Sequence, residues 1–397
     1  MNHAPASAAA EAPQQGRPEA PHVIAPSAEH PPEHIHVALL TDQKYAHLTA
    51  VAISSLVSGF IRFSNLDIFA LDIHIVCIDV DDAAKAMLQQ AMQAALGTPT
   101  TPGKAASTNI RLHCLDHTLP GNPQGKLRWV RLVSQKIHLP DILTDLDRVI
   151  FLDSDIVVVD DISTLWCTSL DGHWMAVVPC LLGNPRNLMN YNIFKIRFKD
   201  ASSPINAGVI IFDLALMRHQ GVVAKLDAWQ ETHLQRLKLP EQEAIAINFP
   251  GQWKALPHRW NFRPYGEPYW TAASWGEFHQ YLQTPPCIVH FQGNVRPFDV
   301  KLNLPYYDEW KRAHNLAHPG QPLHRKTAGY FQFVFFEFPD VLCKLSNLLP
   351  GGLLRFGLMI PLLGLATLPR SIAGYRRYLK NPENYRLRIY DFMPDKR

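Results

Sequence analysis

The sequence has few cysteines, no long apolar run and little excess charge, and each shortage disfavours a class of protein. Six cysteines are scattered without a Cys-x-x-Cys spacing, which argues against a zinc site or a disulfide framework and favours a reducing cytoplasm. No stretch reaches the ~18–20 uninterrupted apolar residues of a spanning helix, and the nearest approach, 356–368, contains Pro361. A net charge of +3 without a basic, aromatic stripe gives no case for nucleic-acid binding.

The chain of 397 residues, 47% apolar and 18% charged, is long enough to bury a large core. Residues 1–34 are rich in Ala and Pro, and we expect them to form a disordered tail and not a signal peptide. A main domain is expected over 35–312. A helical, aromatic and basic region should follow over 313–397, whose last 28 residues carry eight Lys or Arg against three acids.

The hydrophobic pattern alternates between strands and helices. Strands are expected at 36–40, 73–78, 110–115, 149–152, 174–178 and 205–212. Helices are expected at 45–59, 82–96, 127–136, 222–237 and 241–249, with loops at 97–108 and 180–203. Alternating strands and helices imply a mostly parallel sheet joined by right-handed crossovers. The fold class is therefore α/β, of the nucleotide-binding kind.

Two aspartates, Asp153 and Asp155, lie one residue apart where the apolar run 149–152 ends. Ligands of open α/β sheets bind outside the carboxyl ends of the strands. Carboxylates on a short turn suit a hard divalent cation such as Mg²⁺ or Mn²⁺, which is commonly shared with substrate phosphates. The simpler interpretation is that both aspartates only end the strand and begin a turn.

The same pattern also occurs in phosphatases of the haloacid dehalogenase type, where the first aspartate, here Asp153, is a nucleophile. Two observations disfavour that interpretation. The motif normally opens its domain, whereas here more than a hundred residues precede it. The paired downstream acids that such phosphatases need are also missing, since Asp200, Asp213 and Asp227 stand singly.

Four further segments stand in a definite order around the acidic turn: Leu-Thr-Asp-Gln-Lys-Tyr at 40–45, Pro-Ile-Asn-Ala-Gly-Val at 204–209, Glu-Gln-Glu-Ala at 241–244 and His-Phe-Gln-Gly-Asn-Val-Arg-Pro-Phe at 290–298. Together they resemble glycosyltransferase family 8, which holds glycogenin and the bacterial lipopolysaccharide galactosyl- and glucosyltransferases. The resemblance covers about residues 36–310. It is closest to the lipopolysaccharide enzymes, whose Tyr-Ala-Arg-Leu is similar to Trp-Val-Arg-Leu at 129–132.

The resemblance implies a role for each matching residue. Asp153, Asp155 and His290 would be metal ligands, and an imidazole ligand favours Mn²⁺ over Mg²⁺. Donor-binding roles would fall to Asp42 and Tyr45 at the uracil, Arg131 at the sugar or phosphate, Asn206 and Ala207 in the sugar pocket, and Gly293 and Arg296 at the diphosphate. Glu241, Gln242 and Asn206 would lie near the anomeric carbon.

Two of these segments depart from the family pattern. Glu241-Gln242-Glu243 replaces the usual Asp-Gln-Asp, and Arg296 replaces a lysine, which exchanges a compact ammonium for a planar guanidinium. The residue types nevertheless suit a donor whose diphosphate leaves with developing negative charge.

The resemblance further implies a GT-A type, Rossmann-like fold and a retaining, metal-dependent hexosyltransferase. Such an enzyme would move galactose or glucose from a UDP-sugar to a saccharide acceptor such as the lipopolysaccharide core, with the leaving diphosphate helping to deprotonate the acceptor. The alternatives are a self-glucosylating protein, an inactive nucleotide-sugar-binding protein and the phosphatase. The basic, aromatic region 313–397 predicts peripheral attachment to the inner face of an anionic membrane. The alternatives are that it forms the acceptor side of the site or that its aromatic residues only pack a helical subdomain onto the core.

Overall fold

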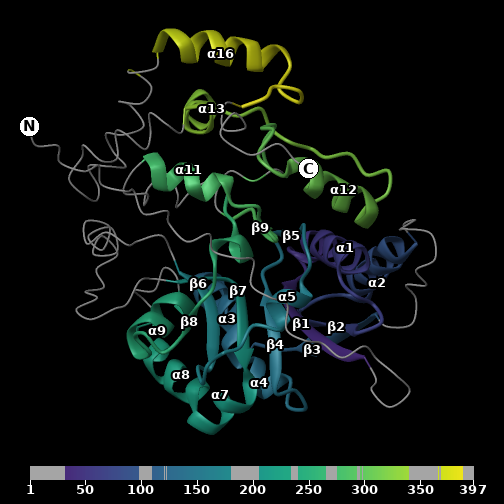
Figure 1. Ribbon diagram of the computed structural model, residues 1–397, viewed down its shortest axis with the longest axis vertical. Coiled ribbons are helices and arrows are strands. Elements are labelled where there is room, and N and C mark those ends of the chain that lie inside the picture. Colours follow the sequence, from purple (N-terminus) through teal and green to yellow (C-terminus); the bar gives the residue numbers. More distant parts are fainter. Residues whose placement is uncertain are drawn as a thin grey trace, which may run out of the picture.

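A computed structural model describes residues 32–97, 110–119, 121, 123–179, 205–233, 240–264, 275–292, 296, 298–338, 365 and 368–387 (Figure 1). The strands are β1 (Glu33–Asp42), β2 (Phe69–Ile78), β3 (Ile110–His117), β4 (Arg148–Leu152), β5 (Ile156–Val158), β6 (Met175–Pro179), β7 (Ile205–Asp213), β8 (Lys254–Ala255) and β9 (Ile288–His290).

The helices begin with α1 (Ala46–Phe63), α2 (Asp82–Leu96), α3 (Gly125–Ser134), η1 (Gln135–His138), α4 (Leu139–Ile142) and α5 (Ser163–Trp166). They continue with α7 (Leu214–Gln220), α8 (Val222–His233), α9 (Pro240–Asn248), η2 (His258–Asn261), α11 (Trp275–Gln283), α12 (Tyr307–Ala317), α13 (Tyr330–Glu337) and α16 (Leu368–Lys380).

A seven-stranded sheet in the order β3-β2-β1-β4-β7-β6-β8 forms the centre of the structure. Strands β3, β2, β1 and β4 pair in parallel, whereas β7 runs antiparallel to both β4 and β6. The prediction of a mostly parallel α/β sheet is confirmed. Because β7 is antiparallel, its amino-terminal end lies beside the carboxyl end of β4. Residues from both segments therefore meet at one edge of the sheet.

Helices cover both faces of this sheet (Figure 1). One core cluster packs α1 and α2 against the sheet, and a second packs α4, α7, α8 and α9 against the other face. By length and composition α1 could cross a membrane, but 78% of its apolar window is buried inside the protein. It is therefore the central helix of the core, and its apolar character reflects burial on most sides.

The predicted elements agree well with those observed, with small differences at their ends. The helix expected at 82–96 is α2, which begins after Asp81, whose carboxylate accepts a hydrogen bond from the Ala84 amide at 2.7 Å. Strand β1 begins at Glu33, whose amide donates to the Ile68 carbonyl at 2.8 Å. Residues 33 and 34, which we assigned to the tail, therefore belong to the sheet. Residues 1–31 and most of the two predicted loops, 97–108 and 180–203, lie outside the described residues.

The C-terminal region is helical, as predicted, but it shares a core with the main domain. The predicted boundary between residues 312 and 313 falls inside α12, which packs against α1 and α2. Trp310, Phe333 and Tyr378 are buried in the same cluster as the apolar residues of β1. A sequence pattern cannot reveal this continuity, because the contacting residues lie hundreds of positions apart.

Candidate functional site

The acidic turn follows β4 and is anchored to four neighbouring segments of the chain. The Asp153 amide donates to the Gly208 carbonyl of β7 at 2.9 Å, and the Asp155 carbonyl accepts from the Phe291 amide at 2.8 Å. The Ser154 hydroxyl donates to the Leu40 carbonyl at 3.0 Å and accepts from Thr49 of α1 at 2.8 Å. The two aspartates are thus held on a fixed turn at the edge of the sheet.

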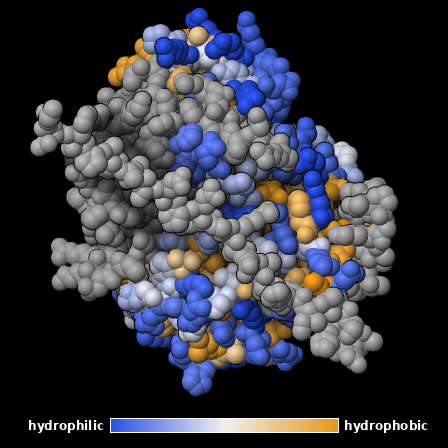
Figure 2. Space-filling model, viewed as in Figure 1, coloured by the Kyte–Doolittle hydropathy of each residue, from blue (hydrophilic) through white to orange (hydrophobic). Residues whose placement is uncertain are grey.

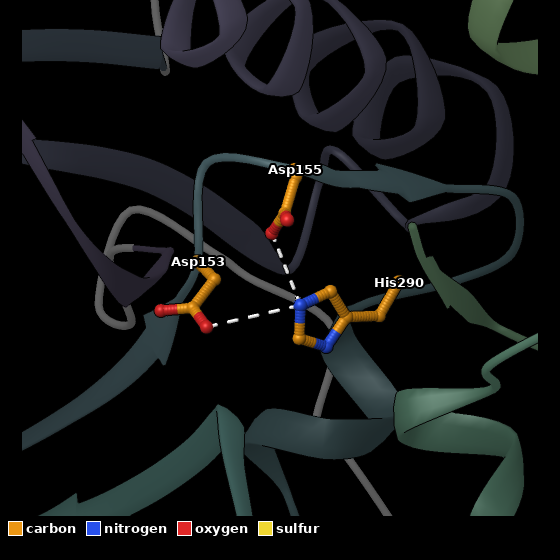
Figure 3. Close-up of side chains that lie close together, drawn as sticks. All are labelled: Asp153, Asp155 and His290. Atoms are coloured by element: carbon orange, nitrogen blue, oxygen red, sulfur yellow. Dashed lines mark ion pairs between the residues drawn. The ribbon is translucent and has the colours of Figure 1, made fainter. Parts of the chain in front are cut away.

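The small sheet β5-β9 brings a histidine to this turn. Strands β5 and β9 pair antiparallel, with Ile156 opposite His290. The His290 Nε2 atom lies 3.0 Å from Asp155 Oδ1 and 3.8 Å from Asp153 Oδ2 (Figure 3). Donor atoms of the three side chains all lie within 4.8 Å of one another. The structure thus brings together the three residues predicted as metal ligands.

A chain of amides determines which nitrogen of His290 faces the aspartates. The Gly208 amide donates to Asn206 Oδ1 at 3.1 Å, which identifies that atom as the oxygen. Asn261 Nδ2 donates to the same oxygen at 2.7 Å, so the Asn261 oxygen is the atom 2.9 Å from His290 Nδ1. His290 therefore carries a proton on Nδ1 and directs Nε2 towards the carboxylates.

This arrangement fits a divalent metal ion. Without a cation, the lone pair of His290 Nε2 would face two carboxylates, so either a proton or a metal ion must lie between them. An imidazole whose other nitrogen donates to a fixed oxygen is the usual form of a histidine ligand. Two carboxylates and one such imidazole suit Mn²⁺, with Mg²⁺ also compatible. Asn261, which the sequence analysis missed, is a lone polar residue between Trp260 and Phe262.

A buried lysine, also missed from the sequence, connects the acidic turn to α9. The Lys136 ammonium lies 2.9 Å from Asp153 Oδ1, 3.1 Å from the Ala207 carbonyl and 3.7 Å from Glu241 Oε1. Lys136 is 4% exposed. Burial lowers its pKa, but Asp153 and Glu241 raise it more, so the net pKa is raised and the side chain stays charged. The sequence offered one signal for a buried lysine here, since Lys136 ends a predicted helix directly before the apolar Ile137.

The predicted catalytic segment lies beside this lysine. Glu241 and Glu243 are buried, which distinguishes them from the solvated acids that often begin a surface helix. Burial raises the pKa of Glu241, and Lys136 partly offsets this effect. Gln242 Nε2 donates to Glu241 Oε1 at 3.4 Å. Asn206 donates to Gln292 at 2.7 Å, and through Asn261 it orients His290.

Several predicted donor-binding residues gather at the same edge. The Asp42 carboxylate accepts from the Tyr45 amide at 3.0 Å, where β1 ends and α1 begins. Arg296 lies near enough to Tyr45 for the two groups to interact electrostatically, and its charge also acts on Asp155. Arg296 Nε donates to Asp299 at 2.7 Å. Gly293 lies outside the described residues.

Arg131 has a partner that the sequence did not suggest. Its guanidinium donates to Glu231 of α8 at 2.8 Å. Arg128, one turn earlier on α3, lies 3.9 Å from Asp42 and 2.9 Å from Asp79. At Asp153 the contacting cation is Lys136. The cations at the two ends of the predicted donor site are thus Arg128, near Asp42, and Lys136, near Asp153. The family resemblance indicated Arg131 for this role.

Gly208 leaves room for the His290 ring. A Cβ atom at this position would lie 2.2 Å from His290 Cε1 and 2.4 Å from Nδ1. We predict that Gly208→Ala displaces the ring and weakens Mn²⁺ binding about 10–100-fold, as loss of ligand orientation does elsewhere. Calorimetric titration with Mn²⁺ and UDP measures this. Gly97→Ala is the control, because its Cβ would meet only ordinary contacts of 3.6 Å and beyond. Wild-type Mn²⁺ affinity in Gly208→Ala would contradict the assignment.

Comparisons with known proteins show the family of this chain. A model described as Glycosyl transferase family 8 matches residues 36–300, well over half of the chain. General stress protein A of Bacillus subtilis (strain 168) is 30% identical over 182 residues, which are 44% of this chain and 62% of that protein. The match thus spans less than two thirds of that relative. Probable galacturonosyltransferase-like 9 of Arabidopsis thaliana is 25% identical over 298 residues, 70% of this chain and 71% of the relative.

Solved structures show a similar fold. The galactosyltransferase LgtC in complex with donor and acceptor sugar analogs has a TM-score of 0.56 at 19% identity, covering 72% of this chain and 98% of that chain. The bifunctional glycosyltransferase WbbM has a TM-score of 0.54 at 17% identity, covering 73% and 50%. These neighbours confirm the GT-A fold, and the family match disfavours the phosphatase alternative. From the matched segment and its fold, we conclude that this chain belongs to glycosyl transferase family 8.

Proposed function

We propose that this protein is a metal-dependent, retaining hexosyltransferase that moves galactose or glucose from a UDP-sugar to a saccharide acceptor, the growing lipopolysaccharide core. One observation carries the proposal: two aspartates and a histidine in the ligand tautomer converge at the carboxyl edge of the sheet. The intact set of Asp153, Asp155, His290 and Gln242 disfavours an inactive binding protein.

The residues of the site have distinct tasks in the proposed reaction. Asp153, Asp155 and His290 would hold a divalent ion such as Mn²⁺, whose positive charge neutralises a leaving diphosphate when bound. Lys136 keeps Asp153 in place. Arg296 offers its guanidinium beside Tyr45, where the donor diphosphate and uracil would lie. Asp42, Arg131 and Ala207, with Gly293, would complete the donor pocket.

The proposed mechanism retains the anomeric configuration of the hexose through a front-face displacement. Glu241 is paired with Lys136 and buried, so it does not offer a free carboxylate nucleophile. In the proposed step, the bond between the anomeric carbon and the diphosphate oxygen breaks, and the acceptor oxygen bonds to the same face. The acceptor proton moves to the departing diphosphate. Glu241, Gln242 and Asn206 would position the hexose through hydrogen bonds to its hydroxyl groups.

An assay of UDP release tests the proposal. Purified protein is incubated with a panel of UDP-hexoses, UDP-glucuronic acid and UDP-galacturonic acid, with and without Mn²⁺. We expect metal-dependent UDP release from UDP-galactose or UDP-glucose, increased by a lipopolysaccharide-core oligosaccharide and abolished by a chelator. Release only from a uronic acid donor would overturn the hexose assignment. Tight UDP binding without turnover on any donor or acceptor of the panel would favour the binding-protein alternative.

Arg296 provides a prediction about donor affinity. We predict that Arg296→Ala weakens UDP binding in the presence of Mn²⁺ about 10-fold or more, since a charge-assisted contact of roughly 1.5–3 kcal/mol is lost. Arg296→Lys should restore much of the affinity, because a lysine ammonium still supplies the charge. Calorimetry with UDP measures both variants, and Arg312→Ala, on the exposed side of α12, is the control. Equal UDP affinity in wild type and Arg296→Ala would place Arg296 outside the donor site.

We further propose that the protein is cytoplasmic and attaches to the inner face of an anionic membrane through α13 and α16. Exposed apolar side chains lie on both helices and just before α16: Phe331, Leu365, Leu368, Ile372 and Leu379. The upper edge of Figure 2, where α16 lies, is mainly hydrophilic with a small hydrophobic patch at its left. The exposed cations of α16 are Arg370, Arg376, Arg377 and Lys380. The helix spacing puts Leu368, Ile372 and Leu379 on one face. Such a helix lies in a membrane interface, with cations at the lipid head groups.

Vesicle co-sedimentation tests this attachment with the full chain, because a truncation would remove the buried Phe333 and Tyr378 from the core. Wild type should pellet with vesicles that contain anionic lipid and be released by high salt. The triple variant Leu368→Glu, Ile372→Glu and Leu379→Glu should remain in solution and still release UDP. Phe63→Glu, exposed on α1, is the control. Absence of wild-type binding to the vesicles would refute the attachment.

A further inference from the structure

Four histidines and an aspartate lie on one face of the three strands β1, β2 and β3, which neighbour one another in the sheet (Figure 1). His34 and His36 alternate on β1, Asp72 and His74 on β2, and His113 lies on β3. In the register, His36 is opposite Asp72, and His74 is opposite His113. Alternate residues of a strand point to the same face. We call these five residues the histidine face.

The histidine face lies away from the family 8 site. Leu39 of β1 is opposite Leu152, the residue before Asp153. His34 and His36 precede Leu39, so they lie towards the amino-terminal end of the strand and away from the acidic turn. No role proposed above uses any of the five residues.

Short contacts join the five side chains. His34 Nδ1 lies 2.5 Å and His113 Nε2 lies 3.2 Å from opposite oxygens of the Asp72 carboxylate. His36 Nδ1 lies 3.2 Å from His74 Nε2 and 4.0 Å from Asp72 Oδ2. Asp72 is therefore a carboxylate surrounded by imidazoles, and two further imidazole nitrogens approach each other directly.

The carboxylate is shielded while the rings remain accessible. The Asp72 side chain is only 6% exposed, whereas the side chains of His34, His36 and His113 are 38%, 23% and 41% exposed. Three imidazole rings of the face are therefore partly open to solvent. The indole ring of Trp166 packs edge-on against the His36 ring, with 6.0 Å between the ring centroids, and so restricts the rotation of His36.

The ring nitrogens that face one another are donors of the kind that metals bind. His36 Nδ1 and His74 Nε2 are 3.2 Å apart, so one ring donates a proton to the lone pair of the other. A metal ion between the two nitrogens would take the place of that proton.

We propose that the histidine face is a second metal site, which binds a divalent transition metal such as Zn²⁺ through His36, His74 and Asp72, with His34 or His113 as a further ligand. Imidazole and carboxylate donors suit Zn²⁺, Co²⁺ and Ni²⁺. In a tetrahedral site with bonds of ~2.0–2.1 Å, ligand atoms lie about 3.3 Å apart, close to the observed 3.2 Å between His36 and His74. To complete the site, side-chain rotation would have to bring Asp72 Oδ2, which lies 4.0 Å from His36 Nδ1, and one exposed ring to the same centre. With His113 as the further ligand the ion would join all three strands, and with His34 it would join β1 and β2.

Cobalt titration of a suitable background variant tests the site. The full-length protein, without a histidine tag, carries Asp153→Asn and Asp155→Asn, which remove two ligands of the family 8 site. We expect one equivalent of Co²⁺ to bind with the visible absorption of four-coordinate cobalt, and Zn²⁺ to displace it. Zn²⁺ should also raise the melting temperature, since binding to the folded state alone stabilises it.

Substitutions identify the ligands. Adding His36→Gln and His74→Gln to the background should abolish the cobalt spectrum and the Zn²⁺-induced rise in melting temperature, whereas His219→Gln, exposed on α7, should leave both unchanged. In a chain with intact aspartates, the same pair of substitutions should retain Mn²⁺-dependent UDP release, which also confirms folding. If the pair prevents folding, the milder His34→Gln should weaken cobalt binding. Absence of cobalt binding in the background variant, or binding that survives loss of His36 and His74, would overturn the proposal.

Discussion

Replacing Asp153 or Asp155 with asparagine is expected to lower metal-dependent transfer at least ~10²-fold. Each substitution removes an anionic ligand of the metal ion whose charge would stabilise the leaving diphosphate. The fold should remain intact, since the side chains are 30% and 17% exposed and asparagine keeps their shape. Initial rates of UDP release over a range of Mn²⁺ concentrations measure the effect. The apparent Mn²⁺ affinity should fall together with the maximal rate.

The control for this experiment is Asp171→Asn, an equal change of shape and charge at an exposed ion pair with Lys254. It should retain wild-type rates. Circular dichroism and melting temperature confirm that the variants fold. Near-normal turnover of Asp153→Asn or Asp155→Asn would remove the basis for the metal site, whatever the outcome at the histidine face.

Replacing Lys136 with methionine is expected to reduce both stability and activity. Methionine preserves much of the volume but leaves Asp153 and the buried Glu241 without their cation. Breaking a buried ion pair by removing one partner costs ~3–5 kcal/mol, and we expect roughly 3 kcal/mol because Asp153 is partly exposed to water. Without Lys136, burial raises the pKa of Glu241 further and favours its protonated form. Urea denaturation measures the stability.

A second substitution separates stability from activity at Lys136. Glu241→Gln in the Lys136→Met background removes the uncompensated buried carboxyl, so stability should partly recover. Transfer activity should not recover, because Asp153 still lacks its positioning contact. Lys126→Met, on the exposed first turn of α3, is the control. A Lys136→Met protein as stable and as active as wild type would refute this role.

The sequence by itself determined the local elements and the acidic turn. Apolar patterns predicted six of the nine described strands and the helices α1, α2, α3, α8 and α9, because burial of one face or stripe repeats with the period of the element. Helix α2 is a clear case, since Asp81 caps its first turn and its buried apolar residues pack largely against α1. Asp153 and Asp155 were identifiable because an apolar strand ends directly before them. These features depend only on neighbours along the chain.

The tertiary structure decided which distant residues complete the site. Asn261 orients His290 through a contact that spans 29 positions of the chain. Lys136 contacts Asp153, 17 positions away, and also the more distant Glu241. Arg131 matched a family pattern, yet the packing of α3 on the neighbouring helices pairs it with Glu231, 100 positions away. Local periodicity carries no information about such pairs. They depend on the order of strands in the sheet and on an antiparallel β7, which places Asn206 and Gly208 beside the acidic turn.

The same reason applies to the C-terminal boundary and to the histidine face. A sequence pattern marks where aromatic and basic residues accumulate. Only packing shows that Tyr378 is buried in the same hydrophobic core as the apolar residues of β1. His34, Asp72 and His113 are ordinary polar residues of three separate strands in the sequence. They become one cluster because parallel pairing brings β1, β2 and β3 into register, and register is a property of the folded sheet.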